Sequence, residues 1–219
     1  MPDLKAVLFD LDGVLVDTHV MHYRSWQQLS DELGLIFNEK LGDEFRGMAR
    51  DECMRVLYAE FNNLPVPDTA ELLELTDRKN GYYHDVLLQA VPEDLILPGA
   101  VELLQNLQQE GITVIVASGS KNANMVIDQA EIRNYFDAIV DRHDVSKSKP
   151  DPEVFLVALE RAGVTAEYAV GVEDAILGVD ALRAARVKSI GVGDFVEDAD
   201  LLIPAIADLT VDMMRELIK

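Results

Sequence analysis

Residues 5–13 read KAVLFDLDG, a short apolar run that ends in two carboxylates and a glycine. The run is continuous rather than alternating and is too short for a helix, which is typical of a strand buried on both faces of a parallel sheet. Four later stretches have the same character, at residues 112–117, 138–140, 169–172 and 189–192. The sequence therefore predicts a parallel sheet.

Helical patterns separate these strands. Residues 101–110 place apolar side chains on one face and stop before a glycine, and residues 151–162 and 175–186 have a similar pattern. Because strands and helices alternate, we predict an α/β fold whose core is a doubly wound, Rossmann-like parallel sheet with right-handed crossovers.

The region after the first strand breaks this alternation, because it contains no convincing buried strand. It is predicted to form three helices, at residues 19–33, 43–61 and 69–90. We therefore predict two domains, which are a core domain of residues 1–16 and 93–219 and an inserted α-helical cap domain of residues 17–92.

Composition excludes several classes of function. The 219 residues include 40 acidic and 19 basic side chains, and the net charge of −21 argues against binding to nucleic acid or to an anionic membrane. The single cysteine, Cys53, cannot form an intramolecular disulfide. Without a signal-like segment or a membrane-spanning run, we expect a cytoplasmic protein, and we expect it to be a monomer.

Polar residues follow the predicted strands, where an open α/β sheet binds its ligands. Asp10 and Asp12 follow the first strand, and Glu173 and Asp174 follow a later one. If the four carboxylates meet, their mutual repulsion requires a cation, and oxygen ligands of this kind suit Mg²⁺. An aspartate beside such an ion can attack a phosphate and form an aspartyl-phosphate. Taken alone, the DLDG stretch could equally be a surface turn.

Two further residues could complete a site for phosphoryl transfer. Lys149 lies on a loop that Pro150 and Pro152 stiffen, and Ser118 follows the strand at residues 112–117. Together they could hold phosphoryl oxygens in a mainly electrostatic site. Considered singly, Lys149 could be an ordinary surface lysine.

These motifs resemble, in order along the whole chain, the four motifs of the haloacid dehalogenase superfamily. The segment at residues 9–18 is similar to the first motif, Ser118 to the second, Lys149 with Pro150 to the third, and Glu173 with Asp174 to the fourth. The helical insert resembles the superfamily's C1-type cap. Residues 18–26, 45–52, 78–80 and 118–122 more narrowly resemble the β-phosphoglucomutases of this superfamily.

The resemblance implies a role for each matching residue. Asp10 would be the nucleophile that carries phosphate, and Asp12 would be the general acid and base. Ser118 and Lys149 would hold the transferring phosphoryl group. Mg²⁺ would be the cofactor, and its ligands would be Asp10, Asp12 through its backbone carbonyl, Glu173 and Asp174.

The resemblance also implies residues that bind the substrate. Those for the second, non-transferring phosphate would be Arg50, Ser120, Lys121 and Asn122. Those on the cap would be His22, Trp26, Arg46, Gly47, Met48 and Lys79. Without the resemblance, Trp26 would be read as a core residue, and His22 and Lys79 as solvated side chains. Arg46 stands where the family usually has lysine, and about three residues are added before it.

Three functions follow as competing expectations. The first is a β-phosphoglucomutase that interconverts β-D-glucose 1-phosphate and β-D-glucose 6-phosphate through β-glucose 1,6-bisphosphate. The second is a sugar-phosphate phosphatase that uses the same aspartyl-phosphate, and the first four motifs do not distinguish it from the mutase. The third, a non-catalytic binding module, is disfavoured because no motif residue is lost. The expected partner is a small sugar phosphate.

Overall fold

The computed structural model describes residues 3–45, 48–194 and 196–219. The chain forms two compact units. One unit, the core, comprises residues 1–17 and 91–219, and the other, the cap unit, comprises residues 18–90. Within the described residues, no helix combines the length and the apolar character that crossing a membrane requires.

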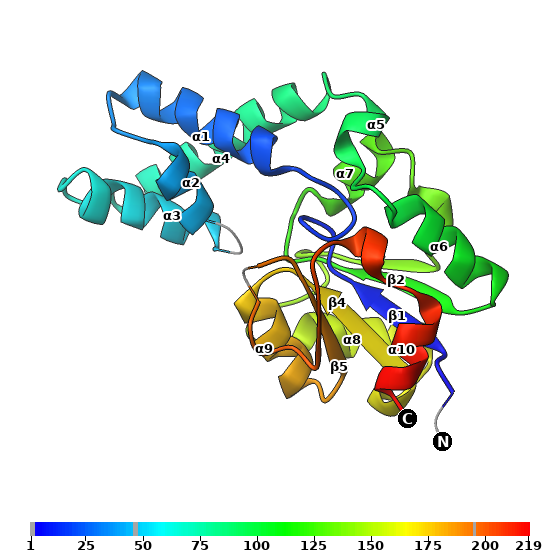
Figure 1. Cartoon of the computed structure of the whole chain (residues 1–219). Coiled ribbons are helices and arrows are strands. Elements are labelled where there is room, and N and C mark those ends of the chain that lie inside the picture. The colour runs from blue at the N-terminus through cyan, green and yellow to red at the C-terminus, as the bar shows by residue number, and fades with distance from the viewer. Residues whose placement is uncertain (1–2, 46–47, 195) are drawn as a thin grey trace. The chain divides into compact units, whose positions relative to one another are not determined.

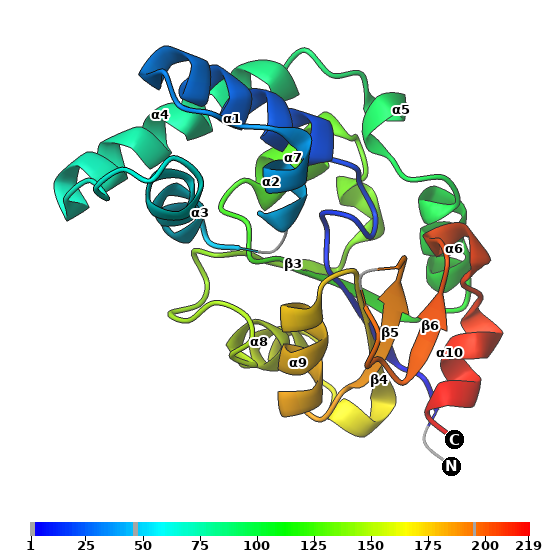
Figure 2. The ribbon, with the colours of Figure 1, turned by 60° about the vertical axis from the view of Figure 1, so that its left-hand side comes forward.

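The core is built on a six-stranded parallel sheet with the strand order β3-β2-β1-β4-β5-β6 (Figures 1 and 2). Its strands are β1 (Ala6–Phe9), β2 (Thr113–Ala117), β3 (Ala138–Val140), β4 (Ala169–Glu173), β5 (Lys188–Val192) and β6 (Leu201–Ile203). The strand order reverses between β1 and β4, and such a reversal is where open α/β sheets bind ligands. The predicted parallel sheet is confirmed, and β6 is a strand that the sequence patterns did not predict.

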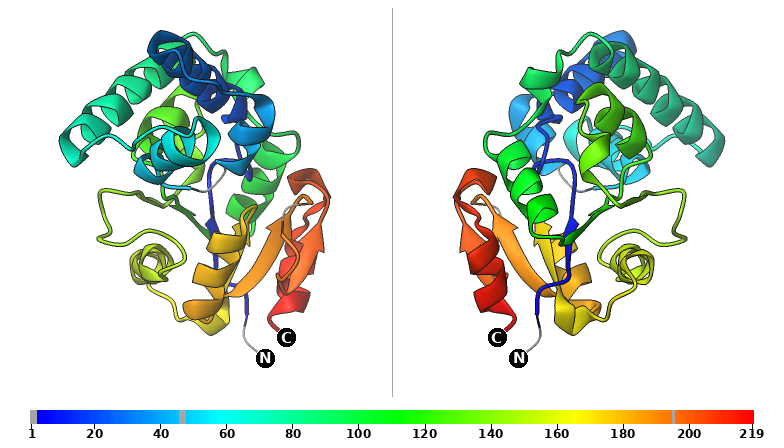
Figure 3. Two further views of the ribbon diagram at one scale, coloured as in Figure 1. Left: turned by 90° about the vertical axis from the view of Figure 1, so that its left-hand side faces the viewer. Right: turned by 90° about the vertical axis from the view of Figure 1, so that its right-hand side faces the viewer.

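Helices cover both faces of this sheet, as expected for a doubly wound fold (Figure 3). The helices of the core are α5 (Pro92–Leu95), α6 (Ala100–Gln109), α7 (Ala123–Gln129), α8 (Glu153–Ala162), α9 (Ile176–Ala184) and α10 (Val211–Leu217). Short 3₁₀ turns, at Arg133–Tyr135, Ala166–Tyr168 and Ile206–Asp208, complete the connections. The α/β class, the parallel core and the inserted helical region are therefore confirmed.

Apolar packing fixes α8 and α9 to one face of the sheet. Leu8 of β1 and Ile115 of β2 belong to one buried cluster with Phe155 of α8 and Leu182 of α9. Burial of each such side chain contributes about 2 kcal/mol, so this cluster holds both helices firmly. The loops at the carboxyl ends of the strands are thereby anchored on a rigid base.

The cap unit is helical. Its elements are α1 (His19–Leu33), α2 (Glu39–Glu44), α3 (Arg50–Val56), a π-helical turn (Leu57–Phe61) and α4 (Thr69–Leu87). The prediction of one helix over residues 43–61 is wrong. Asn38 caps a separate helix earlier, because its side chain accepts a hydrogen bond from the Leu41 amide, and α3 begins only after an extended Ala49.

An aromatic cluster holds the cap unit together. The Trp26 and Phe45 rings meet edge to face with their centroids 5.2 Å apart, and Phe37 contacts both Phe45 and Tyr23. Cys53 lies in the same cluster, and burial raises the pKa of its thiol to about 12. Its low thiolate content makes it a packing residue rather than a nucleophile.

Candidate active site

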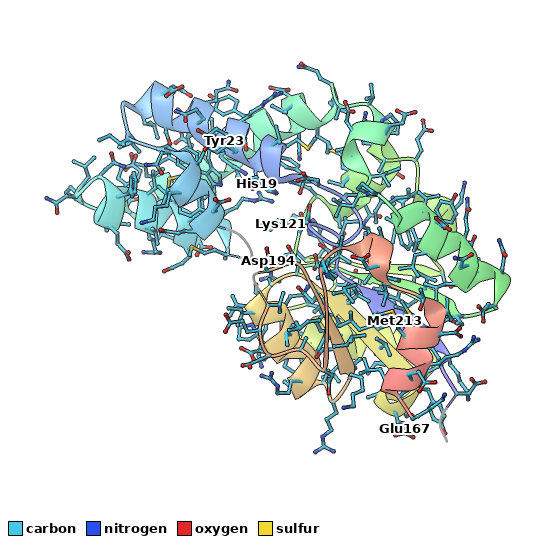
Figure 4. All side chains as sticks on the ribbon, in the orientation of Figure 1. His19, Tyr23, Lys121, Glu167, Asp194 and Met213 are labelled. Atoms are coloured by element: carbon cyan, nitrogen blue, oxygen red, sulfur yellow. The ribbon has the colours of Figure 1, made fainter. Side chains whose placement is uncertain are left out.

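The two central strands bring Asp10 and Glu173 to the same end of the sheet. Phe9 of β1 pairs with Val172 of β4, and the Asp10 amide donates to the Val172 carbonyl at 2.9 Å. Asp10 therefore starts the loop after β1 beside the last residue of β4. Figure 4 shows Lys121 and Asp194, which follow β2 and β5, at this same end of the core, whereas Glu167 lies at the opposite end.

Lys149 joins these two carboxylates. Its Nζ lies 2.5 Å from Asp10 Oδ1 and 2.5 Å from Glu173 Oε1, and the three side chains are only 12%, 11% and 1% exposed. Burial lowers the pKa of the Lys149 ammonium, but the charges of Asp10 and Glu173 outweigh it and raise the pKa above its usual value. Lys149 is therefore a fixed cation at the end of β1 and not an ordinary surface lysine.

Glu173 has hydrogen-bond donors on both of its carboxylate oxygens. Oε1 accepts from Lys149, and Oε2 accepts from the backbone amides of Asp174 and Ala175 at 3.0 and 3.1 Å. Burial raises the pKa of Glu173, while Lys149 opposes that shift. This carboxylate orients Lys149 and ties it to the turn that leads into α9.

Asp174 lies close to the other acids of the site. Burial raises the pKa of its carboxyl to about 8, and the charges of Asp10, Glu173 and Asp12 add to the shift. Gly13 makes the close approach possible, because a Cβ at this position would lie 2.0 Å from Asp174 Oδ2. Gly13 also has a φ of +82°, which strongly favours glycine.

These residues fit a divalent cation that retains open coordination positions. Among the residues that the structure describes, no three side chains of His, Cys, Asp or Glu converge into a complete metal cluster. Magnesium, however, commonly uses one or two carboxylates and takes its remaining ligands from water and substrate phosphate. A carboxyl with its pKa raised by neighbouring acids, as at Asp174, is what an added cation would relieve. Because both Glu173 oxygens already have donors, its direct ligation stays a prediction.

The loop after β2 presents two serine hydroxyls. Ser118 Oγ accepts from the Ser120 amide at 3.0 Å, and Ser120 Oγ accepts from the Asn122 amide at 3.1 Å. A hydroxyl that accepts a backbone hydrogen bond can still donate its own proton, for example to a phosphoryl oxygen. In the same loop, Asn122 is buried and Lys121 is exposed.

Three of the predicted residues, His22, Trp26 and Lys79, lie together in the cap unit. Lys79 Nζ is 2.9 Å from His22 Nδ1 and lies over the rings of Trp26 and Tyr83, 5.0 and 5.3 Å from their centroids. Lys79 is only 1% exposed, so the alternative interpretation of Lys79 as a solvated side chain is wrong. Burial, followed by the positive charge of Lys79, lowers the pKa of His22 well below its usual value, and the imidazole is neutral at neutral pH.

The remaining predicted cap residues lie just before α3 or at its first position. Arg50 is the first residue of α3, and burial lowers the pKa of its guanidinium. Met48 packs against the aromatic cluster, and its carbonyl lies 3.8 Å from the Cys53 thiol. Arg46 and Gly47, also predicted to bind substrate, lie outside the described residues.

The structure also shows site residues that the sequence reasoning missed. Tyr83 packs on His22 with ring centroids 4.5 Å apart, and Gly178 lies against Glu173. A glycine inside a helical pattern was the available signal for Gly178, since such a residue often marks a close approach. Asp141, a polar residue at a predicted strand end, instead accepts hydrogen bonds from Asn124 and from the His143 amide.

Comparison with known proteins places this geometry in a family. The chain is 34% identical over 215 residues to a β-phosphoglucomutase of Bacillus subtilis, covering 97% of this chain and 95% of that protein. It is 27% identical over 207 residues to a phosphorylated-carbohydrates phosphatase of Thermotoga maritima, covering 92% and 91%. The crystal structure of a β-phosphoglucomutase from Clostridium difficile is similar with a TM-score of 0.89 at 31% identity, covering 98% and 97% of the two chains.

A family model described as haloacid dehalogenase-like hydrolase matches residues 4–186. These residues contain every predicted catalytic and metal-binding position, from Asp10 after β1 to Asp174 before α9. With that match and the relatives above, the chain belongs to the haloacid dehalogenase-like hydrolases.

Proposed function

We propose that this chain is a β-phosphoglucomutase, which interconverts β-D-glucose 1-phosphate and β-D-glucose 6-phosphate. The observation that carries the proposal is the pairing of Lys149 with both Asp10 and Glu173 in a chain that resembles the Bacillus subtilis mutase along nearly its whole length. The pairing supports phosphoryl transfer through Asp10, and the resemblance supports a sugar as the acceptor.

The reaction uses Asp10 as a reversible phosphoryl carrier. A carboxylate oxygen of Asp10 attacks phosphorus of β-glucose 1,6-bisphosphate, the bond from phosphorus to the sugar oxygen breaks, and Asp12 gives its proton to that oxygen. In the return step Asp12 takes the proton of the free 6-hydroxyl of β-glucose 1-phosphate, and the oxygen of that hydroxyl attacks the phosphorus on Asp10 as the bond from phosphorus to the Asp10 carboxylate breaks. Lys149 and the Ser118 hydroxyl hold the oxygens of the phosphoryl group during both transfers.

Mg²⁺ fits this role at the carboxyl end of β1. Its protein ligands would be the Asp10 and Asp174 carboxylates and the Asp12 backbone carbonyl, with Glu173 as a further predicted ligand. When bound, the ion supplies positive charge that offsets the carboxylates and the phosphoryl oxygens.

Substrate recognition is assigned to polar and cationic residues of both units. In the core, Ser120, Lys121 and Asn122 are proposed to bind the phosphate that is not transferred. In the cap unit, Arg50 is proposed for the same phosphate, and Lys79, His22 and Trp26 are proposed to select the sugar. The sequence resemblance carries these cap assignments, and the burial of Lys79 between His22 and two aromatic rings is consistent with a defined role.

A sugar-phosphate phosphatase is the second candidate. It is favoured by the similarity to the Thermotoga maritima phosphatase over more than nine-tenths of both chains. It would form the same phosphoenzyme at Asp10, but water rather than a sugar hydroxyl would accept the phosphoryl group.

One assay distinguishes the two functions. The protein is mixed with β-glucose 1-phosphate, Mg²⁺ and a trace of β-glucose 1,6-bisphosphate, and glucose 6-phosphate and free phosphate are measured together. The mutase forms glucose 6-phosphate with little free phosphate. Steady release of phosphate in proportion to substrate consumed would instead assign a phosphatase.

A further inference from the structure

Gly178 lies unusually close to a carboxylate of the candidate active site. It is the third residue of α9 and is buried. A Cβ built on Gly178 would lie 1.8 Å from Glu173 Oε1 and 1.9 Å from Glu173 Cδ, far inside any possible contact distance. The Glu173 carboxylate therefore occupies the space that any other side chain at position 178 would need.

Backbone conformation does not explain a glycine at this position. The φ of Gly178 lies outside the left-handed region, so an alanine could adopt the same backbone. Helix propensity also favours alanine over glycine inside a helix. By contrast, Gly81 of α4 has open space at its Cβ position. The close approach of Glu173, in contrast, leaves no space for a Cβ at position 178.

The position of Glu173 matters because this carboxylate holds several groups at once. Oε1 accepts from Lys149 Nζ at 2.5 Å, and Oε2 accepts from the Asp174 and Ala175 amides. Lys149 in turn contacts Asp10, the proposed nucleophile, at 2.5 Å. If the Glu173 carboxylate moved away, Lys149 would keep its contact with Asp10 and lose its contact with Glu173.

We propose that Gly178 is a positioning residue: its missing side chain makes the space in which Glu173 holds Lys149 and the turn before α9 in place. The inference rests on the proposed phosphoryl transfer through Asp10. The contacts at risk are charge-assisted hydrogen bonds, whose loss corresponds to a decrease of about 10- to 100-fold in the rate of phosphoryl transfer.

The experiment compares Gly178→Ala with a matched control, Gly171→Ala. Gly171 lies on β4 and also faces α9, but its Cβ would meet the end of the Leu182 side chain, 2.1 Å from Cδ2, instead of a carboxylate. Both variants crowd the same strand and helix, and only Gly178→Ala displaces Glu173. The readouts are the rate of phosphoenzyme formation from a small phosphate donor, the Mg²⁺-dependent shift in melting temperature, and the melting temperature itself.

We expect Gly178→Ala to slow phosphoenzyme formation about 10- to 100-fold and to reduce the Mg²⁺-dependent shift. Its melting temperature without Mg²⁺ should fall, because the displaced Glu173 carboxylate loses buried hydrogen bonds. Gly171→Ala should lower the melting temperature and keep the rate. In the double variant Gly178→Ala with Glu173→Asp, the shorter aspartate side chain should relieve the crowding. Its rate of phosphoenzyme formation should therefore exceed that of Gly178→Ala alone.

The proposal is overturned if Gly178→Ala keeps the wild-type rate, or if it loses rate only as much as Gly171→Ala does. If Gly178→Ala does not fold, failure of the double variant to restore folding overturns it as well. Failure of the proposed function would look different: wild-type protein would form the phosphoenzyme but yield no glucose 6-phosphate. The effect of Gly178→Ala on phosphoenzyme formation can still be measured in that case.

Discussion

Two buried lysines, one in each unit, are held in opposite ways. Lys149 of the core lies between the carboxylates of Asp10 and Glu173. Lys79 of the cap unit is held by a neutral ring nitrogen of His22 and by the faces of Trp26 and Tyr83. The contacts of Lys149 are thus with charged carboxylates, and these contacts of Lys79 are with a ring nitrogen and aromatic faces. The comparison shows that a buried lysine can contact carboxylates, as Lys149 does, or a ring nitrogen and aromatic faces, as Lys79 does.

The largest expected effect concerns the acid that Lys149 contacts. Asp10→Asn removes the proposed nucleophile, so we expect the rate to fall at least about 10³-fold and the phosphoenzyme to disappear. Mass spectrometry after incubation with a phosphate donor measures the phosphoenzyme directly. Asp3→Asn, at an exposed position before the same strand, is the control and should retain both. Phosphorylation of the Asp10→Asn protein would contradict the assignment of Asp10 as the nucleophile, and with it the role proposed for its partner Lys149.

Removing the core lysine should cost the most stability. Lys149→Met leaves two buried carboxylates side by side without their shared cation, and breaking a buried ion pair typically costs about 3–5 kcal/mol. Urea unfolding at pH 7 without Mg²⁺ measures this loss. A decrease in the free energy of unfolding below about 1 kcal/mol would show that solvent or protons, and not Lys149, offset the charges of the two acids.

The same substitution in the cap unit should behave differently. In Lys79→Met the methionine can contact the same aromatic rings, so we expect the free energy of unfolding to change by about 1 kcal/mol or less. Under the proposed function, kcat/KM should nevertheless fall at least about tenfold. Urea unfolding and kinetics of Lys149→Met and Lys79→Met together show whether each lysine matters more for stability or for activity. Equal stability losses would contradict the distinction.

Acid crowding in the core predicts a pH dependence. The Asp174 pKa of about 8 means that, between about pH 4 and 8, the folded protein keeps a proton that the unfolded chain has lost. Stability without Mg²⁺ should therefore fall as pH rises through this range, by at most about 1.4 kcal/mol per pH unit. Asp174→Asn should be more stable than wild type near pH 8, with a difference that vanishes near pH 4. Chemical unfolding at both pH values measures it, and equal pH slopes would contradict it.

The smallest effect concerns His22 of the cap unit. Its lowered pKa means that, below about pH 6.5, the unfolded chain binds a proton that the folded protein does not. Stability should therefore decrease as pH falls below 6.5 and be constant with respect to this group above it, with a slope of at most about 1.4 kcal/mol per pH unit. His22→Asn should remove this slope between pH 5 and 6.5 in urea unfolding. An unchanged slope would assign the acid sensitivity elsewhere.

Local sequence patterns predicted the helices and strands whose apolar residues form an uninterrupted run or a regular helical spacing. The strand at β1 and the helix at α1 follow directly from such runs. The helix predicted over residues 43–61 failed because apolar spacing continued across a region where Asn38 and the extended Ala49 set separate helix starts. Strand β6 and helix α10 were missed because each is short and carries a weak pattern.

The candidate site was predictable in part for the same reason. Asp10, Ser118 and Glu173 stand where apolar runs end, so their positions along the chain are visible without coordinates. The closeness of Gly178 to Glu173 and of Tyr83 to His22 was not predicted, because each depends on how two elements pack together. Burial of Lys79 was likewise not predicted, since its neighbours along the chain are mostly polar.

The residues that follow each buried strand can be recognised from the amino-acid sequence, because burial of a short apolar run and the turn after it depend on nearby residues. The contacts of Lys149 with Asp10, 139 residues away, and with Glu173, 24 residues away, arise from the three-dimensional packing of the fold. In the folded chain β1 lies next to β4, and α9 packs so closely against Glu173 that a Cβ at position 178 would collide with its carboxylate. Such contacts depend on the packing of the whole fold, which no local preference encodes.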